Sequence, residues 1–134
     1  MLLPDEIAAK SVVPALRAMV AVKLVKFHGL TQQDVAERLH LTQASISNYM
    51  RKARGGSFNL DNVEKVQTIT TEIALMLSEY KSNPNLILTK FEEANRYVKS
   101  NRLMCEFHMR LEPDIDLDDC DACNEQLVQI KNER

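Results

Sequence analysis

The chain has 134 residues, which is long enough to bury a hydrophobic core without disulfide or metal staples. Three Gly, four Pro and no Trp, with apolar residues recurring at spacings of three and four, favour an all-α fold over a sheet protein with many tight turns. Residues 1–59 carry eight Lys or Arg against four Asp or Glu, and residues 60–134 carry nine against fifteen, so the N-terminal half presents either a basic face for an anionic partner or an ordinary solvated surface.

The first long helix is predicted from near Ser11 to His28, with Pro14 tolerated in its first turn and Gly29 ending it. Residues 5–10 form a separate short turn or continue this helix through a kink. A stripe at helical spacing follows, made of Leu16, Met19, Val20, Lys23, Leu24 and Phe27. Only the lysine breaks the apolar character of this stripe, and its aliphatic stem can lie along it.

The next helix is predicted to begin at Thr31, because Asp34 three residues later forms a variant of the capping box. Val35 faces inward. Ala36 sits where this helix crosses the following one, and its small side chain permits close approach. Leu41 then fills the turn.

Thr42 is a second good N-cap and opens a helix in which Ile46, Tyr49 and Met50 pack inward. The outward positions hold short polar groups that fit base edges in the major groove, and the basic residues at the helix end suit phosphates. This sorting is what a recognition helix needs. The candidate DNA-binding residues are Thr31, Gln32, Thr42, Gln43, Ala44, Ser45, Ser47, Asn48, Arg51, Lys52 and Arg54.

The segment TQQDVAERLHLTQASISNYMRKARG, from Thr31 to Gly55, resembles the helix-turn-helix of Cro/repressor-like and related bacterial and archaeal regulators. The shared pattern is Gln-x-x-x-Ala, an apolar turn residue, Ser or Thr opening the second helix, and then Ile-Ser. The upstream stretch LLPDEIAAKSVVPALRAMVAVKL is similar to the lead-in of small archaeal regulators of this type. The resemblance implies a sequence-specific transcription regulator that binds double-stranded DNA. His40 departs from the pattern, because Gly is frequent there, and a left-handed His40 carries modest strain.

Two further helices are predicted. One starts near Asn59 or Asp61 and runs about 20 residues until Asn83 and Pro84 end it. Its stripe is Val63, Val66, Ile69, Ile73, Met76, Leu77 and Tyr80, and that of the next helix is Leu86, Leu88, Phe91, Ala94, Tyr97 and Val98. These stripes either pair two copies into a homodimer, which reads two half-sites on DNA, or fill an intramolecular core.

The C-terminal region contains Cys105-Glu-Phe-His108 and, after eleven intervening residues, Cys120-Asp-Ala-Cys123. Two residues between ligands let a tight turn aim both at one ion, so these four residues are a candidate Cys3His site for zinc or for an iron-sulfur cluster. The alternative is three reduced thiols with His108 as a polar surface residue. Some archaeal regulators of the type that the chain resembles have cysteine-rich tails that look like cluster sites, which implies sensing of redox state or iron supply.

These patterns divide the chain into a helix-turn-helix DNA-binding domain (1–58), a helical dimerisation region (59–100) and a Cys/His metal-binding tail (101–134), in which a last amphipathic stretch passes through Leu127 and Ile130. We expect no enzyme and no small-molecule substrate, because the chain has neither a glycine-rich phosphate loop nor a nucleophile motif. The alternative function is an adaptor or antitoxin-like module with a structural zinc site.

The N-terminus does not look like a secretory signal, because Met1 is followed by Leu, Leu, Pro and two acids. The longest apolar stretch, near Val12 to Val25, is interrupted by Arg17 and Lys23 and is too short to span a bilayer. We therefore expect a cytoplasmic protein without a membrane partner. In that reducing compartment the three cysteines are ligands or free thiols rather than disulfide partners.

Overall fold

A computed structural model of the protein describes residues 1–52, 58–79 and 82–123. Within these residues every regular element is a helix, which confirms the all-α prediction. The helices are α1 (Pro4–Lys10), α2 (Val12–His28), α3 (Gln32–Leu39), α4 (Gln43–Lys52), α5 (Glu64–Ser78), α6 (Pro84–Ser100) and α7 (Cys105–Leu111). None of them is long and apolar enough to cross a membrane.

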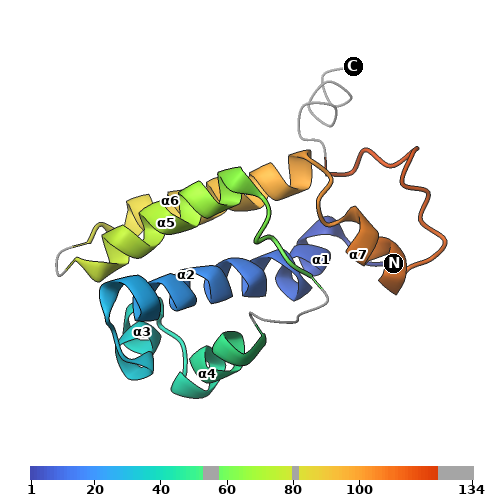
Figure 1. The fold of residues 1–134 in the computed structure, drawn as a ribbon. Helices are drawn as coiled ribbons and strands as arrows, with labels where there is room; N and C mark the ends of the chain where they lie inside the picture. The colour runs from blue at the N-terminus through green and yellow to red at the C-terminus, as the bar shows by residue number, and fades with distance from the viewer. Residues whose placement is uncertain (53–57, 80–81, 124–134) are drawn as a thin grey trace.

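The fold is organised around α2, which has α5 and α6 on one side and α3 and α4 on the other (Figure 1). The predicted stripe of α2 is buried over most of its length, at Leu16, Met19, Val20 and Leu24. Val12 and Ala21, off that stripe, are also fully buried, because neighbours cover α2 from several directions. Phe27 was predicted on the stripe and is 75% exposed, so that prediction is wrong at the last turn.

The N-terminal segment forms its own helix, α1, and a break at Ser11 separates it from α2. The Ser11 backbone leaves the helical region at φ −127° and ψ −69°, and its hydroxyl donates a hydrogen bond to the carbonyl oxygen of Ile7 at 2.6 Å. Ile7 is fully buried and belongs to a hydrophobic cluster that extends as far as Met104. The salt bridge from Lys99 Nζ to Asp5 Oδ1, 2.9 Å long, ties α1 to the end of α6.

Helix α5 begins later and ends earlier than predicted, since it spans Glu64–Ser78 rather than about 20 residues from 59 or 61. Residues before it form a turn instead, in which the backbone N–H of Asp61 donates to the side-chain oxygen of Asn59 at 2.6 Å. Leu60 is 2% exposed, and its burial in the core holds this turn against the helices. Tertiary packing therefore replaces the first helical turn that the sequence pattern allows.

Helix α6 starts directly after Asn83, whose side chain accepts hydrogen bonds from the backbone N–H groups of Asn85 and Leu86, at 3.0 and 3.3 Å. Its buried face differs from the predicted stripe. Ala94 and Val98 are buried as expected, but Leu86 and Leu88 are exposed, and the fully packed residue in the first turns is Ile87. The predicted amphipathic stretch through Leu127 and Ile130 lies outside the described residues.

Candidate functional site

Helix α3 begins at the predicted cap. The backbone N–H of Asp34 donates to the Thr31 hydroxyl at 3.1 Å, and the Thr31 N–H donates to the Asp34 carboxylate at 3.2 Å. The Thr31 side chain and then its N–H are the main causes that hold the pKa of Asp34 below its usual value. These two hydrogen bonds satisfy the backbone N–H groups of Thr31 and Asp34, and they fix the residue at which α3 starts.

Residues 40–42 connect α3 to α4 through a left-handed residue. His40 has φ 54° and ψ 44°, so it takes the left-handed conformation at the position where Gly is frequent. Its N–H donates to the Glu37 carbonyl oxygen at 3.3 Å, and the Leu41 N–H donates to that of Ala36 at 2.9 Å. Leu41 is half-buried against the core, as expected of a residue that fills the turn. The connection is short and hydrogen-bonded, so α3 and α4 are held in one orientation.

Helix α4 is anchored on its inner face. The backbone N–H of Ser45 donates to the Thr42 hydroxyl at 3.1 Å, which confirms the second predicted cap. Ile46 is fully buried, and Tyr49 and Met50 are half-buried and pack against the core. The inner face predicted from the sequence is therefore the one that the fold buries.

The outer face of α4 carries Gln43, Ala44, Asn48 and Arg51, all exposed, with Ser47 half-buried beside them. Within the described residues, the side chains of Gln43, Asn48 and Arg51 make no hydrogen bond or ion pair with one another or with the rest of the fold. Their polar groups point to solvent and are available to a ligand.

The remaining predicted DNA-binding residues serve helix caps, are half-buried, or lie outside the described residues. The hydroxyls of Thr42 and Ser45 are 2.9 Å apart and serve the cap of α4, as Thr31 serves that of α3, while Gln32 is half-buried in the first turn of α3. Arg54 and the side chain of Lys52 lie outside the described residues.

Arg38 has a role that the sequence did not indicate. Its guanidinium donates to the Leu77 carbonyl oxygen in the last turn of α5. A cation at a helix C-terminus satisfies a free carbonyl and complements the helix dipole. Arg38 therefore ties α3 to α5, and a basic residue in the last turn of α3 was the only hint of this contact.

The three cysteines lie in the C-terminal part, at the start of α7 and in the segment after it, and all are half-buried. Burial is the main cause that raises the pKa of the Cys123 thiol, and the charges of Cys105 and Cys120 raise it further. Lys99 and Arg102 act in the opposite direction.

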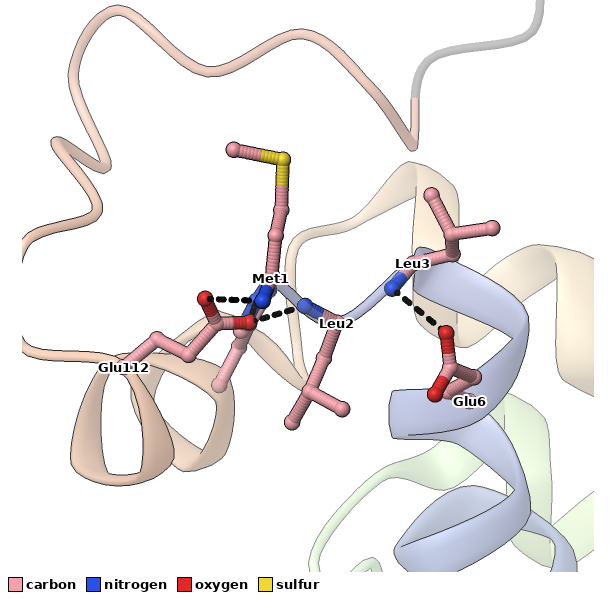
Figure 2. Close-up of polar contacts among 6 residues, drawn as sticks. Met1, Leu2, Leu3, Glu6 and Glu112 are labelled. Carbon is pink, nitrogen blue, oxygen red and sulfur yellow. Dashed lines mark hydrogen bonds and ion pairs between the residues drawn. The ribbon is translucent and has the colours of Figure 1, made fainter.

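His108, the fourth predicted ligand, faces a carboxylate. Its Nε2 lies 3.1 Å from Glu112 Oε1, one turn further along the chain. Glu112 also accepts a hydrogen bond from the backbone N–H of Leu2 and lies 3.8 Å from the Met1 amino group (Figure 2). The Leu2 N–H is the largest cause that lowers the pKa of Glu112. This contact joins the N-terminus to α7, and no sequence pattern predicted it.

Among the described residues, no three His, Cys, Asp or Glu side chains form a ready cluster for a metal ion. The structure directs one nitrogen of His108 to Glu112. In many metal sites a ligating histidine donates its other ring N–H to a carboxylate, so the contact of His108 with Glu112 leaves Nδ1 as the nitrogen for a metal. The metal site stays a prediction.

No protein-family model matches the chain, and the searches of curated proteins and of solved structures found no match.

Proposed function

We propose that the chain is a sequence-specific transcription regulator in which α3 and α4 form a helix-turn-helix, and α4 enters the major groove of double-stranded DNA. The observation that carries this proposal is the division of α4 into an anchored inner face and an outer face of uncommitted polar side chains. Ile46 is fully buried, whereas Asn48 and Arg51 are exposed. A helix with this division is rigidly held and still free to contact base edges.

The residues of the outer face suit different parts of DNA. Gln43 and Asn48 carry amide groups, which can donate and accept together at an adenine edge, and Ala44 can contact a thymine methyl group. Arg51, near the end of α4, suits a phosphate. The capping hydroxyls of Thr31 and Thr42 are committed to the helices, so we assign them the role of positioning α3 and α4.

The test is to select bound fragments from random DNA with the full chain and then to measure affinity at several salt concentrations. Asn48→Ala is expected to relax the preference at one base pair by about 1–3 kcal/mol. Arg51→Ala is expected to weaken binding to all sequences and to reduce the salt slope by about 1. The control is Arg96→Ala, because Arg96 pairs with Glu92 on α6, across α2 from α4 (Figure 1).

If the chain shows no salt-dependent affinity for any DNA, the regulator is rejected. An adaptor or antitoxin-like module, which uses the same helices to bind protein, then becomes the better explanation. Equal effects of Arg51→Ala and Arg96→Ala would reject the assignment of α4 as the reading helix, because both changes remove one positive charge.

We also propose that the regulator acts as a homodimer in the cytoplasm. Two copies related by a two-fold axis read half-sites about 34–36 Å apart. The structure uses most of the predicted stripes inside one copy, but Leu75, Leu86 and Leu88 remain 53%, 46% and 69% exposed at one end of the α5 and α6 pair. A monomeric mass by light scattering at working concentration would reject the dimer.

We further propose that the C-terminal cysteines are the input of the regulator, through zinc or an iron-sulfur cluster. The donor chemistry fits either group, because thiolate and imidazole ligands suit both zinc and iron-sulfur clusters. A bound cation would also oppose the burial and the charges of Cys105 and Cys120 that raise the pKa of Cys123. Zinc would pin the segment, whereas a cluster would add redox chemistry. The check is metal content and visible absorption after anaerobic purification, with Cys123→Ser expected to lose both. Absence of iron and of visible absorption rejects the cluster, and absence of zinc as well rejects the metal site.

A further inference from the structure

A groove of about 1150 Å³ lies along α2, beside the end of α4. Its floor includes Ala18 and Met19 of α2. Its walls come from the last described turns of α4, from residues 58–61 and from Phe107 of α7. We call it the α2 groove. It therefore borders both the helix proposed to read DNA and the helix that carries the first predicted metal ligands.

The lining of the α2 groove is rich in aromatic side chains. Three of the four phenylalanines in the chain, Phe27, Phe58 and Phe107, line it. Phe58 and Phe107 meet edge to face, with 5.8 Å between ring centroids and 66° between ring planes. Phe27 is 75% exposed at the other end of the groove, which is unusual for so large an apolar residue inside a helix. The packing inside the chain leaves this surface partly open.

The charged residues of the α2 groove are predominantly basic: Lys10, Lys23, Lys26 and Arg51 face one acid, Asp61. Lys23 is half-buried, and its Nζ donates to the side-chain oxygen of Gln67 at 2.7 Å. Burial is the main cause that lowers the pKa of Lys23, and Asp61 only partly opposes it. No carboxylate of the described residues lies within ion-pair distance of this ammonium, so its one close partner among them is the neutral side chain of Gln67.

We propose that the α2 groove binds a small organic anion, with its apolar ring or chain among the phenylalanines and its carboxylate, sulfonate or phosphate at Lys23. An anionic group would supply the counter-charge that Lys23 lacks, and the apolar body would cover the exposed face of Phe27. The volume is ample, since ligand sites commonly measure about 300–1000 Å³. A neutral apolar ligand would form no ion pair with the four cations, and an inorganic anion would make no apolar contact with the aromatic side chains.

A ligand in the α2 groove would contact α4 at one side and α7 at another. Tyr49 and Met50 of α4 line it, and their neighbour Ile46 anchors that helix. Phe107 lies on α7 between Cys105 and His108. A bound anion would therefore alter how α4 is presented, and it would change DNA affinity; this second step rests on the proposed function, whereas binding itself does not.

The test uses the fluorescence of two probes with the full chain. Anilinonaphthalene sulfonate carries a ring system and an anion, and N-phenylnaphthylamine is its uncharged counterpart. Lys23→Gln is expected to weaken the sulfonate about tenfold and to leave the neutral probe within about twofold. Val22→Trp, which fills the groove from α2, is expected to weaken both probes at least about tenfold. The control is Lys65→Gln on α5, an exposed lysine paired with Glu93, which should change neither.

Circular dichroism melts show whether each variant is folded. If Lys23→Gln is not, Lys26→Gln on the groove rim replaces it, with an expected loss of about threefold for the sulfonate alone. Unchanged sulfonate binding in a folded Lys23→Gln or Lys26→Gln chain, or unchanged binding of both probes by Val22→Trp, overturns the proposal. If the probes behave as expected but the chain binds no DNA, the anion site stands and the regulator fails.

Discussion

Two helices end on a left-handed residue, and the two residues differ in kind. Gly29 follows α2 with φ 68°, and His40 follows α3 with φ 54°. Gly29 donates its backbone N–H to the Leu24 carbonyl oxygen and His40 to those of Ala36 and Glu37, and these hydrogen bonds do not depend on the side chain. Introducing glycine by His40→Gly and removing it by Gly29→Ala therefore isolates the free-energy cost of the left-handed conformation.

Backbone strain in the folded state and conformational freedom in the unfolded state act in opposite directions on the free energy of unfolding, and both can be estimated. A left-handed conformation disfavours a residue with a Cβ atom by about 1–2 kcal/mol, whereas glycine loses about 0.4–1 kcal/mol through the greater freedom of its unfolded chain. His40→Gly should therefore raise the free energy of unfolding by about 0.5–1 kcal/mol. Gly29→Ala should lower it by a similar amount, because a Cβ atom at Gly29 meets nothing within 4 Å and adds no clash.

Urea unfolding followed by far-ultraviolet circular dichroism measures both changes, and thermal midpoints should move by about 2–5 °C in opposite directions. The two variants control each other, since both alter only a helix end. A His40→Gly chain that is less stable than the wild type would refute the reasoning, because it would show that the exposed His40 side chain stabilises the turn by more than its backbone strain costs.

Other predictions concern the two helices of the proposed reading unit. Ile46→Ala should lower the free energy of unfolding by about 2–5 kcal/mol, because it empties a fully buried site, whereas Gln43→Ala on the exposed face should change it by less than about 0.5 kcal/mol; equal effects in urea unfolding would contradict the burial of Ile46. The pKa of Asp34 is held below its ordinary value of 3.8 in the folded state, so the unfolded chain binds the proton more readily and stability falls as the pH falls from 3.8 through the folded value. Asp34→Asn should remove part of this decline, and an unchanged profile of unfolding free energy against pH would exclude that contribution.

The sequence by itself predicted the features that depend on near neighbours along the chain. The caps at Thr31 and Thr42 and the end of α2 at Gly29 are as predicted, and His40 takes the left-handed conformation at the position where Gly is frequent. Each involves backbone groups within a few positions of the residue concerned, and so its energy is largely set by local sequence. For the same reason the inner face of α4 was identified, since one face of a short helix carries Ile46, Tyr49 and Met50.

Tertiary structure decided what depends on distant neighbours. Periodicity alone could not tell that Phe27 is exposed or that Ile87 is buried in place of Leu86 and Leu88, because burial depends on which helices cover a surface. The late start of α5 likewise follows from the packing of Leu60.

The candidate sites divide in the same way. The outer residues of α4 could be read from helical spacing, but the contact of Glu112 with Leu2 joins residues 110 positions apart, and the α2 groove collects residues from α2, α4, α7 and residues 58–61. The spacing of residues along the chain determines on which face of a helix each side chain lies. It does not determine the distance between one helix and another. That distance is set by how the apolar surfaces of all the helices pack together, which only the folded chain determines.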